Sequence, residues 1–374
     1  MQAPVRTHSF TFIRLALAAA VVFSHSFARC GIRADPLDRW SGGQLSCGRL
    51  AVIGFFAISG FLLSQSLQLN PSLLRYCVHR AARILPGYWL ALLLTCFVLA
   101  PMLIYQESSG VLSYWEMLRL GPNTALGYVA NNWSLHVGQE EISAVFDKST
   151  GLHSINGSLW TLYHEAMCYA GLLLLWTFRG LRAPVVLVLW SAVYGLHILD
   201  FADHRAFIMI SPLAASAGHF FSIATFRALY LAFLSGMLVC QFGLHERGSR
   251  VWFILAVAAL LASAPSHLST IVWPLTLPWI LVSGAHRWPA GRSTQQDDWS
   301  YGLYIYTFPL QQCLALGGLQ RFGVVPFFIV SLLLGSGAGA LSWRLVESPV
   351  LNWARGRLKK ELPPLALPTA LDLA

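Results

Sequence analysis

Charged residues are scarce in this chain. Asp, Glu, Lys and Arg make up only 11% of its 374 residues, whereas about a quarter is usual for soluble domains. A chain of this length needs more charge to cover a surface that faces water, so the composition excludes an ordinary soluble globular protein. Low-complexity tracts, heptad runs and phosphate-binding glycine loops are also missing, and nothing in the sequence indicates a separate soluble domain.

In place of charge, the sequence has long apolar blocks. Hydrophobic residues make up 56% of the chain, and many fall in blocks about long enough to cross a hydrocarbon core as a helix. We therefore expect an all-α, polytopic integral membrane protein with about ten transmembrane helices. The ten expected spans are 10–28, 49–67, 84–105, 158–177, 183–200, 227–242, 251–264, 269–285, 300–318 and 324–343.

Two regions do not fit this simple series of spans. The stretch 206–223 is apolar but contains Pro212 and His219, so we interpret it as an interfacial or re-entrant segment. The residues after the last span are too few for a second folded domain. We therefore expect one membrane domain over 1–350 and a short, disordered cytoplasmic tail over 351–374. Arg14 and His25 interrupt the first apolar block, which argues against a cleaved signal peptide.

The distribution of basic residues predicts the orientation. With the N-terminus in the cytoplasm, 15 of the 25 Lys and Arg residues lie on the inner side and nine on the outer side. The positive-inside rule then places both termini in the cytoplasm. The net charge of +9 is explained by topology, so it indicates no nucleic-acid partner. The outer loop 29–49 is locally rich in Arg, which suits an anionic acceptor or lipid headgroups.

The first expected span contains two polar residues, Arg14 and His25. A charge at mid-membrane costs about 2.5–3.5 kcal/mol on insertion scales. The eleven-residue spacing puts both side chains within about 20° of one helix face and about 16 Å apart along the axis. Arg14 would then lie toward the cytoplasm and His25 near the outer end. Snorkelling of Arg14 is an alternative explanation, but an aligned pair favours a functional polar seam.

Two further polar groups stand out. Glu165 and Tyr169 are four residues apart in the fourth span and share a helix face, with Trp160 at the outer end of the same segment. A buried structural pair is as good an explanation of that spacing as a functional carboxylate. Arg80 and Arg83 stand at the cytoplasmic end of the third span, where an ordinary positive-inside flank is the better explanation from position alone.

Six segments together resemble the membrane-bound acyltransferase 3 family, which O-acylates sugars and other acceptors. The Arg14 and His25 spacing is similar to its first-span motif, and the segment G-F-F-A-I-S-G-F at 54–61, which contains Ser59, resembles its second-span motif. The remaining four segments are R-A-A-R-I-L-P at 80–86, S-L-W-T-L-Y-H-E-A-M-C-Y at 158–169, S-Y-G-L-Y-I-Y-T-F-P at 300–309 and R-L-V-E-S-P at 344–349. Each is weak alone, but their order over nearly the whole chain is specific.

The sequence departs from the family pattern at two positions. No Asp precedes Arg14, and Thr307 stands where the family often has His, so we assign no chemistry to Thr307. The resemblance implies a cytoplasmic acyl-CoA donor, usually acetyl-CoA, and a hydroxyl acceptor such as a glycan on the outer side. It also implies the plasma membrane of a bacterium, the inner membrane. No permanently bound cofactor and no metal are expected.

The resemblance also suggests roles for the polar residues. Arg14, Arg80 and Arg83 would bind the donor, because guanidinium groups suit phosphate. His25 would act as the base that activates the acceptor hydroxyl, or would carry the acyl group itself. Glu165 would orient His25 or stabilise its protonated form, while Ser59, Trp160 and Tyr169 would support the site.

Several alternatives stay open. A secondary transporter or permease for a lipid-linked or small polar substrate would also have polar residues inside ten spans, although the sequence shows no internal repeat. The sequence does not determine the acceptor, the acyl chain length or the oligomeric state. Of the seven cysteines, only Cys30 and Cys47 fall in an outer loop, so we predict a disulfide between them.

Overall fold

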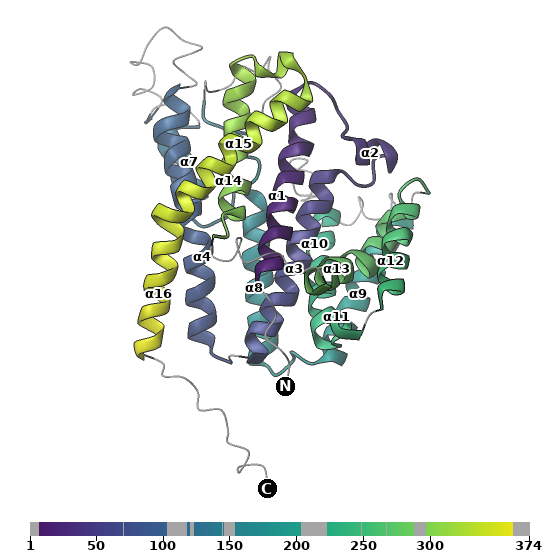
Figure 1. Ribbon diagram of the computed structural model, residues 1–374. Coiled ribbons are helices and arrows are strands. Elements are labelled where there is room, and N and C mark those ends of the chain that lie inside the picture. Colours follow the sequence, from purple (N-terminus) through teal and green to yellow (C-terminus); the bar gives the residue numbers. More distant parts are fainter. Residues whose placement is uncertain are drawn as a thin grey trace.

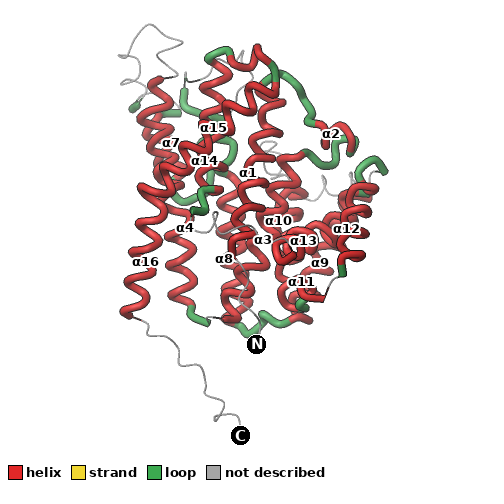
Figure 2. The backbone as a smooth tube through the Cα atoms, viewed as in Figure 1, coloured by secondary structure: helices red, strands yellow, loops and turns green. Residues whose placement is uncertain are grey.

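The computed structural model is helical in all the regular structure that it describes (Figures 1 and 2). It describes residues 7–69, 71–102, 118–119, 123–143, 145, 154–202, 223–247, 249–266, 268–287 and 297–361. The α-helices are α1 (Thr7–Arg29), α2 (Pro36–Trp40), α3 (Cys47–Leu69), α4 (Leu73–Leu94), α7 (Ala125–Asn132), α8 (Trp160–Thr177), α9 (Ala183–Ala202), α10 (Ile223–Gln241), α11 (Leu244–Arg247), α12 (Arg250–Ser263), α13 (Ser269–Arg287), α14 (Ser300–Leu316), α15 (Val324–Ser342) and α16 (Ser348–Glu361). Two π-helical segments, η1 (Thr95–Leu99) and η5 (Trp343–Glu347), and one 3-10 helix, η4 (Leu319–Phe322), complete them.

The expected spans coincide with helices. Four continuous helical stretches among the described residues are long and apolar enough to cross a bilayer: Ser9–Arg29, Cys47–Leu69, Leu73–Met102 and Val324–Leu358. The third is longer than its expected span because α4 begins at Leu73, and the fourth because the π-helical segment η5 joins α15 to α16. The described part of the chain is therefore all-helical with several membrane-spanning candidates, while the full number of crossings and their direction stay predictions. The segment 206–223 lies outside the described residues, apart from Ile223, where α10 begins.

Glycines allow α3 and α10 to pack closely. A Cβ on Gly60 would lie 2.0 Å from the carbonyl oxygen of Phe233, and one on Gly236 would lie 1.9 Å from that of Ala57. No larger side chain fits at either position without separating the helices. Small residues at helix contacts are the usual means of packing in a membrane, where burial of apolar surface gives little driving force. The segment at 54–61 therefore packs α3 against α10.

Helices α14 and α15 pack by the same principle. A Cβ on Gly302 would lie 2.7 Å from the Cα of Gly339, and a Cβ on Gly335 would overlap the hydroxyl of Thr307. The Thr307 hydroxyl donates to the carbonyl of Leu303 at 2.6 Å. Thr307 therefore fills a notch at Gly335, which leaves no room there for a larger side chain.

Tyrosine hydroxyls hold α4 where Pro86 interrupts its hydrogen bonding. A proline inside a helix removes one backbone donor and bends the helix. Tyr301 donates to the carbonyl of Ile84 at 2.7 Å, and Tyr306 donates to that of Gly87 at 3.1 Å. A Cβ on Gly87 would lie 2.7 Å from the Tyr301 ring, so glycine is required at that position. The part of α4 around Pro86 is thereby attached to α14.

Asp35 organises the connection between α1 and α3. Its carboxylate accepts from the Ser24 hydroxyl at 2.6 Å and from the Cys47 amide at 2.9 Å, and it also caps α2. Cys30 and Cys47 are both free thiols. The predicted disulfide is therefore wrong for this structure, because hydrogen bonds to one buried carboxylate tie this loop instead.

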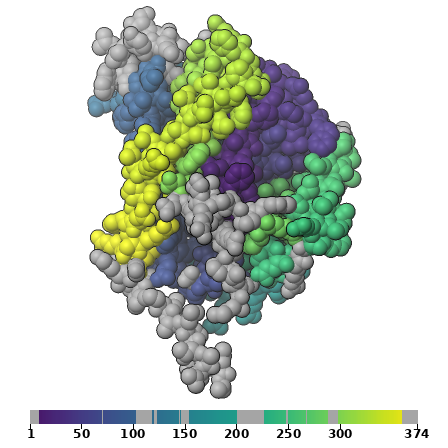
Figure 3. All heavy atoms as spheres, viewed as in Figure 1, coloured from purple at the N-terminus to yellow at the C-terminus, as the bar shows by residue number. Residues whose placement is uncertain are grey.

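Helix α16 follows α15 along one side of the molecule. In the space-filling view, α15 and α16 form the yellow-green edge on one side, and α12 and α13 lie on the opposite side in green (Figure 3). Buried side chains of α16, Leu351 and Ala354, pack with Ala82 of α4. Residues 351–361 of the expected disordered tail are thus helical, and 362–374 lie outside the described residues.

Candidate functional site

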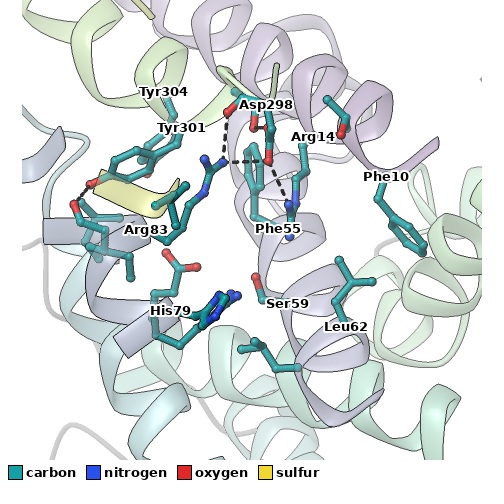
Figure 4. A pocket seen from close by; sticks show the side chains of 18 of the residues that line it. Phe10, Arg14, Phe55, Ser59, Leu62, His79, Arg83, Asp298, Tyr301 and Tyr304 are labelled. Atoms are coloured by element: carbon teal, nitrogen blue, oxygen red, sulfur yellow. Dashed lines mark hydrogen bonds and ion pairs between the residues drawn. The ribbon is translucent and has the colours of Figure 1, made fainter. Parts of the chain in front are cut away.

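A cavity of about 780 Å³ lies among α1, α3, α4, α8, α14 and α16 (Figure 4). A volume of this size is typical of pockets that enclose a small-molecule ligand. Its walls are partly apolar, with Phe10, Phe55 and Leu62 among the lining residues, and partly charged. The described residues contain no group of three or more His, Cys, Asp or Glu side chains that could hold a metal.

Most of the residues expected to form a site line this one cavity. They come from four sequence motifs on four helices and are Arg14, Ser59, Arg80, Arg83, Glu165 and Tyr169. Trp160 does not line it; its ring lies 5.8 Å from that of His164, and it borders a separate void of about 10 Å³. His25 does not line it either. The structure thus brings the expected donor-binding residues together and places His25 apart from them.

Asp298, in the loop before α14, lies between two of these arginines. Its Oδ2 accepts from Arg14 Nη1 at 3.1 Å and from Arg83 Nη2 at 2.7 Å, and Ser300 donates to its other oxygen (Figure 4). Burial favours the neutral acid, but the two guanidinium groups and the hydrogen bonds outweigh burial and hold the pKa of Asp298 below its usual value. Asp298 is therefore a carboxylate at neutral pH and balances part of the arginine charge.

Arg83 has a second acidic neighbour, Glu347. Its Nη1 lies 3.5 Å from Glu347 Oε2, a charge contact rather than a hydrogen bond, and the Glu347 side chain is fully buried. The hydroxyl of Ser342 donates to the other oxygen of Glu347 at 3.0 Å. Glu347 ends the π-helical segment η5, and such segments are frequent at functional sites because the extra residue redirects a side chain. Arg83 is therefore enclosed by two acids.

Arg80 is in a different electrostatic position from Arg83. Among the described residues it makes no ion pair, and its guanidinium lies 5.8 Å from the ring centre of Tyr169. The Tyr169 hydroxyl donates in turn to Glu165. The two arginines of one short motif thus differ, since Arg83 is neutralised while Arg80 offers its charge to the cavity.

His25 lies against Phe308 of α14. Their ring centres are 5.0 Å apart in an edge-to-face arrangement, and the guanidinium of Arg29 stands 4.8 Å from the same ring centre. A Cβ on Gly157 would lie 2.7 Å from the Phe308 ring, so only glycine lets the ring occupy this position. His25, Arg29, Phe308 and Gly157 form a second cluster, which we call the outer cluster.

The expected support of His25 by Arg14 and Glu165 is not among the contacts of the described residues. Arg14 pairs with Asp298, and Glu165 accepts from Tyr169. The cavity and the outer cluster are nevertheless linked through α14. Tyr304 lines the cavity, and Phe308 of the outer cluster follows it by one turn of α14, about 6 Å along the axis. The Tyr304 ring packs on Phe55, and its hydroxyl lies 2.8 Å from that of Thr161.

Sequence reasoning missed Asp298, Glu347, Arg29 and Phe308. A signal existed for each acid: Asp298 directly precedes an expected span on the side where Arg14 and Arg83 lie, and Glu347 stands inside a recognised motif. Arg29 follows His25 by four residues, the spacing of side chains on one helix face. Phe308 also stands inside a recognised motif, but the sequence does not pair it with His25, because that contact joins distant segments.

Comparisons with known proteins find similar sequences over most of the chain. A family model described as "Acyltransferase domain" matches residues 7–336. The O-acetyl transferase of Shigella phage Sf6 is 26% identical over 94% of this chain and 98% of its own length. Nodulation protein 10 of Rhizobium leguminosarum bv. viciae is 26% identical over 92% and 93%, and the exopolysaccharide production protein ExoZ of Rhizobium meliloti (strain 1021) is 24% identical over 85% and 94%. No solved structure matches the chain.

Proposed function

Because this chain belongs to the Acyltransferase domain family and is therefore an acyltransferase, we propose that it moves an acyl group from cytoplasmic acyl-CoA to a hydroxyl on the outer side of the membrane. The acyl group is acetyl and the acceptor is a surface glycan. The names of two relatives, an O-acetyl transferase and an exopolysaccharide production protein, support this choice. The membrane is the plasma membrane of a bacterium.

The cavity is the site of the donor. Coenzyme A carries several phosphate charges at one end and a thin pantetheine arm at the other. Arg80 supplies a cation without an acidic partner among the described residues, and Arg14 and Arg83 keep N–H groups beyond those that contact Asp298 and Glu347. A guanidinium has five such donors, so a paired arginine can still donate to a carbonyl. We assign phosphate contacts to Arg80 and contacts to the pantetheine arm to Arg14, which Arg83 holds in place through Asp298.

The outer cluster is the site of the acceptor. His25 lies about 16 Å along α1 from Arg14, toward the end expected to face outward. Phe308 fixes the plane of the imidazole from one side, and an aromatic ring is also a suitable platform for a sugar. The acyl group would pass from the cavity to His25 beside the turn of α14 that carries Tyr304 and Phe308.

The reaction needs one proton transfer and one exchange at carbon. His25 takes the proton of the acceptor hydroxyl while the hydroxyl oxygen attacks the thioester carbonyl. The C–O bond forms, the C–S bond breaks, and the CoA thiolate leaves and takes up the proton. A second route uses the imidazole as the first nucleophile and passes the acyl group on from it. In either route the positive charge develops on the imidazole of His25, and Glu165, which accepts from Tyr169 in the cavity wall, would favour that charge only over a distance.

One observation carries this proposal: a cavity lined by charged motif residues has Tyr304 in its wall, one helical turn from the ring that contacts His25. The test is mass spectrometry of surface glycans from a deletion strain of the native host. Complementation with the unaltered gene should restore O-acetyl groups, and His25→Ala should not. Purified protein with radiolabelled acetyl-CoA and the extracted glycan should release free CoA, whereas a permease would not.

A further inference from the structure

The charged residues of the cavity separate into paired and unpaired groups. Asp298 forms ion pairs with Arg14 and Arg83, and Glu347 forms one with Arg83. Asp297 accepts from the Trp343 indole and lies 3.9 Å from Arg344. Two arginines that line the cavity, Arg80 and Arg355, have no acidic partner among the described residues. The positive charge available to a ligand therefore comes from these two side chains.

Arg355 has its position from the fold of α16. Four residues of that helix line the cavity, Ser348, Leu351, Asn352 and Arg355, and their spacing puts them on one helix face. On the same helix, Leu351 and Ala354 are 6% and 1% exposed and pack against α4. The packing of α16 on α4 thereby fixes which side of the helix faces the cavity.

Arg355 and Arg80 come from neighbouring helices and line the same cavity, as does His79. Helices α4 and α16 are in contact, and His79 precedes Arg80 on α4. Two forked cations on adjoining walls of one cavity match the oxygens of a phosphate or diphosphate better than a single carboxylate. Arg355 lies beyond residue 336, where the match to the family model ends.

We propose that Arg355, together with Arg80, binds the nucleotide phosphates of the acyl-CoA donor, so that α16 forms part of the donor site. This inference rests on the proposed function and deepens it. Arg83 has the opposite role: its two acidic neighbours make it a positioning residue, which holds Asp298 and Arg14 in place.

The experiment measures binding of CoA by titration calorimetry to the purified protein in nanodiscs of neutral lipid. The unaltered protein should bind CoA, and Arg355→Ala should bind it about tenfold more weakly, the usual effect of losing one contact to a charged group. Binding of S-acetyl-pantetheine, which lacks the nucleotide, should change less than twofold. Arg355→Lys should recover only part of the affinity, because it keeps the charge and loses the fork.

Arg357→Ala is the matched control. Arg357 is on the same helix, lies 5.4 Å from the ring centre of Trp353 and does not line the cavity, so its loss should leave CoA affinity unchanged. If the unaltered protein fails to bind CoA, the proposed function itself is wrong. If it binds CoA and Arg355→Ala binds equally well, only the role of Arg355 is refuted.

Anionic lipid headgroups offer the same phosphate chemistry, so a further arm separates the two sources. Native mass spectrometry after extraction from phosphatidylglycerol membranes counts retained lipid for the unaltered protein and for Arg355→Ala. Equal retention in both, with the loss of CoA affinity, supports the donor site. Loss of bound phosphatidylglycerol in Arg355→Ala, with unchanged CoA affinity, would assign the pair to lipid and overturn the proposal.

Discussion

Asp298 links Arg14 to Arg83. One oxygen of its carboxylate lies 3.1 Å from Arg14 and 2.7 Å from Arg83, so a single acid joins α1, α4 and the start of α14. Arg14 and Arg83 belong to separate motifs, and their positive charges would repel each other without this carboxylate. The geometry of the donor site therefore depends on an acidic residue that does not itself need to contact the donor.

Replacement of Asp298 by Asn should weaken both the site and the fold. Removing one partner of a buried ion pair typically lowers the free energy of unfolding by about 3–5 kcal/mol. Because the Asp298 side chain is 17% exposed, we expect a loss of roughly half that amount. The Michaelis constant for acyl-CoA should rise at least as much as turnover falls. Thermal unfolding in detergent measures the loss of stability, and steady-state kinetics measure the changes in the Michaelis constant and in turnover. An Asn variant as stable and active as the unaltered protein would contradict the role of Asp298.

The pH dependence of stability should show the same carboxylate. The pKa of Asp298 is below its usual value in the folded state, so its stabilising effect is complete above the unfolded-state pKa of about 4. It is lost as the pH falls through the lower folded-state pKa. A thermal-shift series from pH 7 to pH 3 should therefore show an acid-side loss of stability that is smaller in Asp298→Asn. Parallel curves for the two proteins would refute this assignment.

Arg80 and Arg83 should respond differently to removal. Arg80→Ala should raise the Michaelis constant for acyl-CoA with little effect on stability, because its only described contact is with the Tyr169 ring. Arg83→Ala should lower stability as well, since it leaves Asp298 with one cationic partner and the buried Glu347 with no cationic partner. Unfolding temperatures and donor kinetics on both variants decide this. Equal loss of stability in the two would show that Arg80 has a structural partner as well.

Gly157→Ala should disturb the outer cluster without touching His25 itself. The added methyl group would lie 2.7 Å from the Phe308 ring and would push that ring from its place beside His25 and Arg29. Turnover should fall by tenfold or more, the order of effect expected when a reacting group is misplaced. The affinity for acyl-CoA should stay the same.

Gly171→Ala is the control for that experiment, because a Cβ on Gly171 meets nothing within 4 Å. It should keep full turnover. A Gly157→Ala enzyme with normal turnover would show that the position of Phe308 has no bearing on catalysis.

Much of the fold could be predicted from apolar blocks, and the errors have physical reasons. The block 84–105 predicts the start of a span, whereas α4 begins at Leu73, because a helix continues through charged residues when these line a polar cavity. Helix α16 was missed for a related reason. Its sequence is mostly polar and charged, so it contains no apolar run long enough to predict a span.

Site residues that belong to sequence motifs could be predicted, whereas residues that join the site through contacts between distant segments could not. Arg14, Arg80, Arg83 and Glu165 follow from their motifs, and the structure brings them to one cavity. Asp298 is 284 residues from Arg14 along the chain, and no local pattern reports a pairing over that distance. The predicted disulfide failed similarly, because the hydrogen bonds of Asp35 to Ser24 and Cys47 cannot be derived from cysteine spacing.

The most direct test of the central claim is acyl transfer by His25→Ala. The purified variant in nanodiscs is compared with the unaltered protein for CoA affinity and for transfer of labelled acetyl groups to the extracted glycan. The account predicts unchanged CoA affinity and no transfer above background, because His25 lies outside the donor cavity and supplies the proton acceptor. A well-folded His25→Ala protein that acylates the glycan at the unaltered rate would contradict it.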